Sequence, residues 1–164
     1  MNPLNAFEKW SPDIENVLKN IAHNSGLMSS HHKKKYEELI KSLMYYKIPI
    51  IIFSSINSVF AVGLSSYIKQ DVVSLINCLI SLLCGCIGSV ELYLSIQRRS
   101  DAELLSYKQF YALALRINSM LKLDSDHRNT DGDTFLTSCL GDYSSLFENS
   151  QVNGLNELDQ LVDL

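Results

Sequence analysis

Two long uncharged stretches, separated by only three residues, constrain this chain more than any other feature. Twenty-one residues without a formal charge lie between Lys47 and Lys69, and 19 more lie between Asp71 and Glu91. As helices these stretches would be about 31 Å and about 28 Å long, close to the hydrocarbon thickness of a bilayer. The alternative is a soluble bundle in which the two stretches bury each other, and their length argues against it. The sequence therefore predicts two transmembrane helices.

The expected domain layout follows from these stretches. The predicted spans cover residues 48–68 and 72–94, and the three residues between them allow only a tight antiparallel helical hairpin. We expect an all-α fold in which this hairpin, residues 47–97, is continued by cytoplasmic helices packed as an antiparallel stalk. The layout assigns residues 1–46 to cytoplasmic N-terminal helices, residues 98–123 to a cytoplasmic amphipathic helix, and residues 124–164 to an acidic loop, a short helix and a frayed tail.

The charges that flank the spans predict their orientation. Basic residues precede the first span and follow the second, whereas the turn offers only Lys69; the flanking set is Lys33, Lys34, Lys35, Lys41, Lys47, Arg98, Arg99 and Lys108. Loops rich in Lys and Arg stay on the cytoplasmic side, so we expect both termini inside and the turn on the far side. Residues 1–10 lack the apolar run of a secretory signal, and the first span is expected to act as the targeting signal.

Apolar residues at helical spacing predict that the segments beside the hairpin continue as helices. The downstream segment carries the candidate packing and interaction face, formed by Tyr107, Phe110, Tyr111, Leu113 and Ile117. We expect this face to pack in the stalk and to bind a neighbouring protein, either a second copy, a capsid component or another membrane protein.

The ends of the N-terminal helix are also predicted from local residues. Ser11-Pro12-Asp13 is typical of a helix start, with Ser11 as the N-cap and Pro12 in the first position. Asn24-Ser25-Gly26 predicts the end of that helix.

Polar residues inside the predicted spans leave two alternatives open. Asn57, Asn77 and several serines can hydrogen-bond between the two helices of the hairpin, or they can line a pore formed by several copies. Glu91 lies at the edge of the second span, where a carboxylate binds a cation or remains a solvated interface residue.

The remaining motifs argue against metal binding and catalysis. His31 and His32 are adjacent, so they point in different directions on a helix, and we expect solvated histidines beside a lysine run rather than metal ligands. The aspartates between Asp124 and Asp133 fail the spacing of a calcium loop. The chain shows no phosphate-binding loop, nucleophile motif or disulfide framework. We therefore expect no enzymatic activity, no cofactor and no metal site.

Charge also argues against nucleic acid as a partner. Residues 98–164 carry 11 acidic side chains against 6 basic ones, a net charge of −5. An acidic segment repels phosphates, so direct binding of DNA or RNA is not expected.

Short pieces spread over most of the chain carry a resemblance to a known group. They are Trp10, His32 to Tyr36, Lys47 to Ser54, Tyr107 to Tyr111, and Asp142 to Ser150. In this order they resemble the small two-span membrane proteins of nucleocytoplasmic large DNA viruses, the giant viruses and their relatives. The resemblance implies an integral membrane protein that acts as a structural anchor or assembly component, for example in an internal virion membrane beneath a capsid or in a host membrane.

A second, more distant similarity concerns the plan alone. A two-span hairpin with a cytoplasmic helical extension is similar to bacterial two-span modules proposed as pore-forming effectors. This similarity implies the alternative function, an oligomeric pore or channel-like effector formed by the hairpin.

Overall fold

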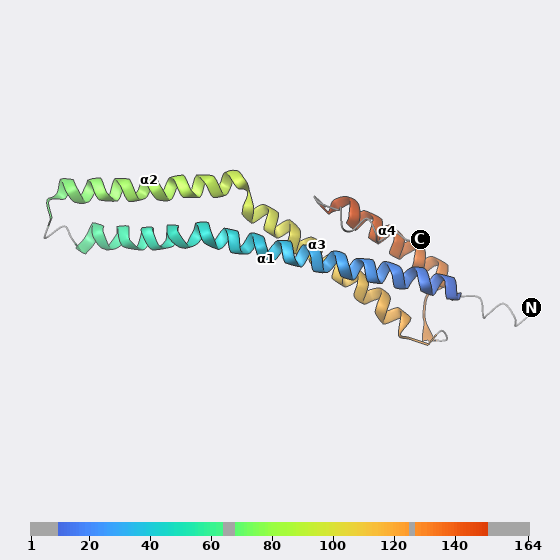
Figure 1. The fold of residues 1–164 in the computed structure, drawn as a ribbon. Helices are drawn as coiled ribbons and strands as arrows, with labels where there is room; N and C mark the ends of the chain where they lie inside the picture. The colour runs from blue at the N-terminus through green and yellow to red at the C-terminus, as the bar shows by residue number, and fades with distance from the viewer. Residues whose placement is uncertain (1–9, 64–67, 125–126, 151–164) are drawn as a thin grey trace, which may run out of the picture. The chain divides into compact units, whose positions relative to one another are not determined.

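The computed structural model describes residues 10–63, 68–124 and 127–150 of the chain. These residues form four helices and no strand: α1 (Pro12–Gly63), α2 (Gln70–Leu94), α3 (Ile96–Leu121) and α4 (Gly132–Asn149) (Figure 1). The expected all-α fold is confirmed. The tail predicted to be frayed comprises the last fifteen residues, of which 151–164 lie outside the described residues.

The chain divides into two compact units. The hairpin unit is Lys35–Asp101, and the helical unit is Met1–Lys34 together with Ala102–Leu164. The 52 residues of α1 contribute to both units, and so do those of α3. Each unit has its own internal contacts and is described separately below.

α1 begins as predicted and does not end as predicted. The Ile14 amide donates to the Ser11 hydroxyl at 3.3 Å, which confirms Ser11 as the N-cap. The predicted end at Asn24-Ser25-Gly26 is wrong, because α1 continues without interruption to Gly63. A glycine inside a helix costs about 1 kcal/mol, whereas burial of the nearby Met28 side chain contributes about 1.5–3 kcal/mol. Tertiary packing therefore outweighs the local preference.

In the hairpin unit, α1 and α2 run antiparallel. The Lys47 ammonium donates to the side-chain oxygen of Gln97 at 2.8 Å, and the Asn57 side-chain amide donates to the Ser81 hydroxyl at 3.4 Å. Residues later in α1 therefore contact residues earlier in the segment that follows, as antiparallel helices do. Gly88 faces α1, and a Cβ at that position would lie 4.0 Å from Cδ1 of Ile50, an ordinary van der Waals distance. The least exposed residues of α2 recur every three or four positions, the spacing of one helix face: Val73, Asn77, Ile80, Cys84, Ile87 and Glu91.

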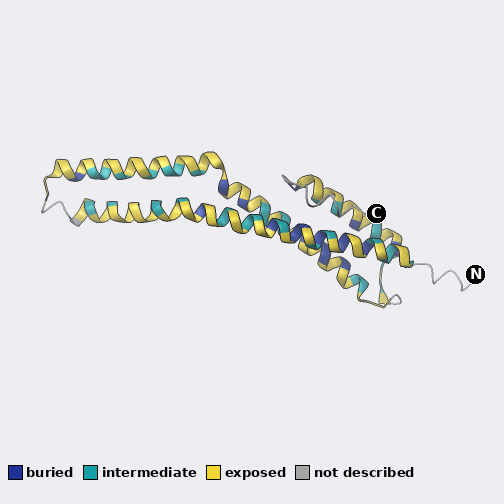
Figure 2. Cartoon of the chain, in the orientation of Figure 1, coloured by how far each residue is buried: buried dark blue, intermediate teal, exposed yellow. Residues whose placement is uncertain are grey.

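Most large apolar side chains of the hairpin unit face outward. α1, and α2 together with α3, each contain an 18-residue window apolar enough to cross a membrane, and only 6% of either window is buried (Figure 2). The core helix of a soluble protein would be mostly buried. The exposed side chains include Ile51, Ile52, Ile56, Val59, Val62, Leu75, Leu79, Leu82, Leu83 and Leu92. The two long apolar helices are therefore present, and their outward faces are not covered by the residues that the structure describes.

A single serine separates α2 from α3. Ser95 adopts a left-handed conformation, φ 51° and ψ 35°, and its amide donates to the carbonyl of Leu92 at 3.1 Å. A left-handed residue that is not glycine costs about 1–2 kcal/mol. The serine hydroxyl offsets part of this cost by bonding to the same carbonyl at 3.3 Å.

The helical unit holds a core made by three helices. α1 contributes Leu18, Ile21 and Ala22, α3 contributes Leu113 and Ile117, and α4 contributes Phe135 and Cys139. Ser29 contacts Tyr107 and His32 contacts Glu103, so this part of α1 is antiparallel to α3. The antiparallel helical packing expected outside the spans is therefore present within this unit.

The loop between α3 and α4 is fastened by Arg128. Its guanidinium donates to the Glu15 carboxylate at 2.6 Å, to the carbonyls of Leu123 and Leu121, and lies 4.4 Å from the centre of the Trp10 ring. The Trp10 indole donates to the carbonyl of Thr130 at 3.1 Å. The predicted acidic loop is therefore partly buried at Arg128, whose guanidinium pairs with the first turn of α1.

Ile117 provides a direct test of this core. Its side chain is fully buried in the helical unit, so Ile117→Ala should lower the free energy of unfolding of that unit by about 2–5 kcal/mol. Unfolding of the full chain by urea, followed through the fluorescence of Trp10, measures the change. The matched control is Leu115→Ala, because Leu115 is 55% exposed on the same helix and its loss should change stability by no more than about 0.5 kcal/mol. Equal losses for the two variants would contradict the assigned core.

Candidate functional site

The predicted interaction face is divided by the structure between core and surface. Phe110, Leu113 and Ile117 are buried within the helical unit, whereas Tyr111 is 56% exposed and Tyr107 is half-buried. Phe110 lies against the His32 ring and, edge to face, against Tyr143 of α4. Only the two tyrosines therefore remain on a surface that another molecule can reach.

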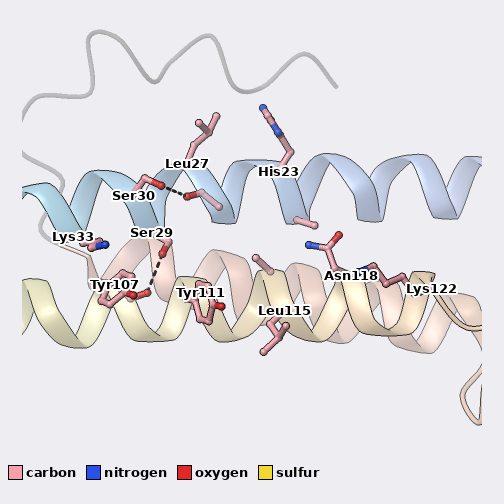
Figure 3. Close-up of a pocket in the computed structure, with 13 residues that line it drawn as sticks. His23, Leu27, Ser29, Ser30, Lys33, Tyr107, Tyr111, Leu115, Asn118 and Lys122 are labelled. Atoms are coloured by element: carbon pink, nitrogen blue, oxygen red, sulfur yellow. Dashed lines mark hydrogen bonds between the residues drawn. The ribbon is translucent and has the colours of Figure 1, made fainter.

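Those tyrosines line a groove between α1 and α3, with a volume of about 740 Å³. Small residues make it hollow, namely Ala22 and Gly26 on α1 and Ala114 on α3. A Cβ added at Gly26 would meet nothing within 4 Å, so the space above this residue is open. The rest of the lining is His23, Leu27, Ser29, Ser30, Lys33, Tyr107, Tyr111, Leu115, Asn118 and Lys122 (Figure 3).

The groove combines apolar rims with basic ends. Leu27, His23 and Leu115 form the outer rims, and Figure 3 shows Leu27 and His23 pointing from α1 away from α3, and Leu115 pointing from α3 away from α1. Lys33 lies at the end near Tyr107, and Lys122 lies at the opposite end. The Ser29 hydroxyl donates to the carbonyl of Tyr107 at 3.3 Å and ties the two walls together. The groove suits an elongated ligand that is apolar along its length and acidic at its ends.

A buried polar pair lies beneath this end of the helical unit. His32 is fully buried, and its Nδ1 lies 2.5 Å from Oε2 of Glu103 on α3. An ionised carboxylate only accepts hydrogen bonds, so Nδ1 donates. The His32 ring stacks on Phe110 at 5.6 Å between centroids, and its Nε2 is buried without a hydrogen-bond partner among the described residues. The prediction that His32 is solvated is wrong.

Sequence reasoning missed this pair for a definite reason. His32 and Glu103 are 71 positions apart and meet only because α1 and α3 are antiparallel. A signal was nevertheless present, since His32 falls on the apolar spacing of α1, between Met28 and Leu39. A histidine on an apolar helix face needs a buried partner.

The three polar residues singled out in the hairpin do not form one cluster: two lie between the helices and the third lies near the end of α2. Asn57 and Asn77 are half-buried between α1 and α2, and the side-chain oxygen of each has no hydrogen-bond partner among the described residues. Glu91 is half-buried near the end of α2. Asn57 bonds to Ser81 through its amide group. The structure does not assign a hydrogen bond or an ion pair to Glu91.

Serines on the outward faces of the hairpin are satisfied by their own helices. The Ser55 hydroxyl donates to the carbonyl of Ile51 at 2.8 Å, Ser58 donates to Ser54 at 3.0 Å, and Ser89 donates to Gly85 at 2.8 Å. A serine that bonds back by one helical turn presents no free donor to its surroundings. These serines are therefore compatible with an apolar solvent.

The described part of the chain brings no metal-binding cluster together, and its buried cysteine is not activated. Within it, no three His, Cys, Asp or Glu side chains come together as metal ligands. Burial raises the pKa of the Cys139 thiol above its ordinary value of 9.0, although the nearby Arg116 opposes this, and burial also raises the pKa of Tyr143 above 10.0. Cys139 is therefore a protonated core thiol at neutral pH rather than a nucleophile.

Comparison with known proteins gives one informative similarity. The chain is 28% identical over 149 residues to "Uncharacterized protein VP11" of Micromonas pusilla reovirus (isolate Netherlands/2005), a match that covers 91% of this chain and 77% of that protein. No protein-family model matches the chain, and no solved structure matches it. The similarity supports a viral relative, whereas the resemblance to proteins of large DNA viruses remains a prediction.

The His32–Glu103 pair can be tested by a double-mutant cycle. Glu103→Leu leaves a buried imidazole without its acceptor, and His32→Leu leaves a mostly buried carboxylate without its donor, so each should lower the free energy of unfolding by about 2–5 kcal/mol. Because the double variant leaves no unpaired polar group, it should be more stable than the two single losses predict. Urea unfolding measures all four proteins, and strictly additive losses would show that the two side chains do not interact.

Proposed function

We propose that this chain is an integral membrane protein of a virus, and that it serves as an anchor or assembly component rather than as an enzyme. The α1–α2 hairpin crosses the bilayer, both termini lie on the cytoplasmic side, and the helical unit contacts proteins there. The partner is a second copy of this chain or a capsid or other membrane protein.

The observation that carries this proposal is the outward apolar surface of the hairpin unit. Large apolar side chains cover both helices, and soluble monomers rarely expose contiguous apolar patches above a few hundred Å². In a bilayer the same side chains are in their preferred solvent, and the backbone groups are satisfied inside the helices. The internally bonded serines agree with this environment.

The viral part of the proposal is supported by the similarity to the reovirus protein, whose own function is uncharacterised. The orientation is supported by the basic residues that flank the spans. The contact surface proposed for the partner is the groove beside Tyr107 and Tyr111, because these are the residues of the predicted face that remain accessible.

Insertion into the bilayer makes a sharp prediction. Leu83→Lys places a charge in the middle of α2, where its side chain is exposed, at a cost of about 2.5–3.5 kcal/mol in a membrane. The fraction of full-length protein that resists alkaline extraction from membranes should fall severalfold. Leu105→Lys is the matched control, since Leu105 is equally exposed but lies on α3 outside the predicted spans, and it should leave the fraction unchanged. A wild-type chain released by alkaline washing would overturn the proposal.

One observation favours the pore as the second candidate function. The side-chain oxygens of Asn57 and Asn77 lie between α1 and α2 without partners among the described residues. In an apolar solvent such oxygens are satisfied by water or by donors from another copy. An oligomer of hairpins around a water-filled path would supply both.

A single reconstitution distinguishes anchor from pore. Full-length protein in lipid vesicles is cross-linked to measure self-association, and ion flux is recorded from the same vesicles. The anchor predicts silent vesicles, with cross-linked species that fall about fivefold in Tyr111→Asp and persist in Ser119→Asp, an exposed position on α3 outside the groove. Flux that rises more steeply than linearly with protein and changes in Glu91→Gln would establish the pore instead.

A further inference from the structure

One end of the hairpin unit carries exposed basic side chains on both of its helices. We propose that this surface binds the headgroups of anionic phospholipids in the cytoplasmic leaflet of a membrane. We call the surface the basic collar, and it consists of Lys41 and Lys47 of α1 with Arg98 and Arg99 of α3. The proposal rests on the proposed function, because it needs the hairpin to be in a bilayer, and it deepens that function by naming the class of lipid.

The concentration of charge is the first argument. Residues 39–47 and 92–100 hold the four basic residues of the collar and no acidic residue. From the ends of the predicted spans outward, the basic residues come first, and the acidic Glu38 and Asp101 come after them. The other end of the hairpin offers Lys69 and Asp71, whose charges cancel. Only the end with the collar therefore attracts anions at the membrane surface.

The second argument is that these charges are available to a ligand. All four residues of the collar are exposed. Lys41, Arg98 and Arg99 form no ion pair with another described residue, and Lys47 donates to the side chain of Gln97, which is neutral. The positive charges are therefore not compensated within the described part of the hairpin unit.

The depth of the collar is the third argument. Lys47 directly precedes the first predicted span, and Arg98 and Arg99 follow the second within five residues. The headgroup layer is about 5–8 Å thick on each side of the hydrocarbon core. Lys41 lies about 9 Å further along α1 than Lys47, within reach of that layer through its long side chain. The collar therefore lies at the level of lipid headgroups.

Two exposed tyrosines indicate the same depth. Tyr45 is 79% exposed and Tyr93 is 89% exposed. Tyrosines concentrate at membrane–water interfaces, because the ring is apolar and the hydroxyl is polar. Tyr45 lies two residues before Lys47, and Tyr93 lies five residues before Arg98. Aromatic and basic side chains thus meet where hydrocarbon gives way to headgroups.

The directions of the charges favour a layer of lipids over a single bound anion. Ile96 and Ser100 are buried and mark the inner face of α3. At about 100° per residue, Arg98 points away from that face, and Arg99 points to one side of it. Lys47 lies on the side of Gln97, across the inner face from Arg99. Charges that point in several directions match headgroups that surround the hairpin, rather than one phosphate in a pocket.

The collar determines which membrane the hairpin prefers. One basic residue near an anionic membrane surface strengthens binding by a factor of about five. A bilayer with anionic lipid in its cytoplasmic leaflet is therefore preferred over a neutral bilayer.

The experiment uses the full chain in phosphatidylcholine vesicles that contain a trace of spin-labelled phosphatidylserine or spin-labelled phosphatidylcholine. Electron paramagnetic resonance separates lipids in contact with the protein, whose motion is restricted, from the remaining lipids. The association constant of phosphatidylserine should exceed that of phosphatidylcholine about fivefold, since each headgroup pairs with one basic side chain. Arg98→Gln combined with Arg99→Gln should lower this preference by about half, because half of the collar remains. High salt should lower it in the parent chain as well.

Lys33→Gln combined with Lys34→Gln is the matched control. It removes the same charge from two adjacent exposed residues of the helical unit, 14 and 13 residues before Lys47, and it should keep the preference of the parent chain. Equal association of the two lipids with the parent chain, a preference unchanged in the arginine variant, or the same loss in both variants would each overturn the collar. If neither lipid shows a restricted population, insertion itself is overturned and the collar with it, so the two failures are distinguishable.

Discussion

Packing against one helix, α1, is the constraint on which both units depend. In the helical unit the core is formed where Leu18, Ile21 and Ala22 of α1 meet α3 and α4. In the hairpin unit the recorded contacts join α1 to α2 and to the segment that follows it. A helix that serves two units must present the right residues at helical spacing over its whole length. This requirement explains why α1 continues through Asn24, Ser25 and Gly26, where local preference alone would end it.

The positions of the apolar helices and the start of α1 could be predicted from the sequence, because they depend on residues that are close together in it. The uncharged runs, the helical spacing near Phe110 and the cap at Ser11 are all properties of neighbouring residues. The contacts that join distant segments could not be predicted in this way. His32 with Glu103, and Arg128 with Glu15, are separated by 71 and 113 positions, and each pair exists only after the helices pack.

The candidate site shows the same division. The sequence predicts that the five residues from Tyr107 to Ile117 form one face, yet packing buries three of them and leaves the tyrosines beside a groove. The groove itself depends on the small residues Ala22, Gly26 and Ala114. Ala22 and Gly26 belong to α1, the helix that faces the predicted stripe on α3. Helical periodicity identifies an apolar stripe, but the boundary between core and docking surface is set by the size of side chains on the opposing helix.

The left-handed serine between α2 and α3 has a consequence for how this chain can change in length. The least exposed residues of α2, and those of α3, recur at three and four positions. From the half-buried Glu91 to the buried Ile96 the step is five, so the angular phase of the stripe changes at Ser95. Deleting one residue there would turn every later side chain of α3 by about 100° relative to α2. The direction in which the α3 side chains point therefore depends on the number of residues at this junction and not only on which residues stand there.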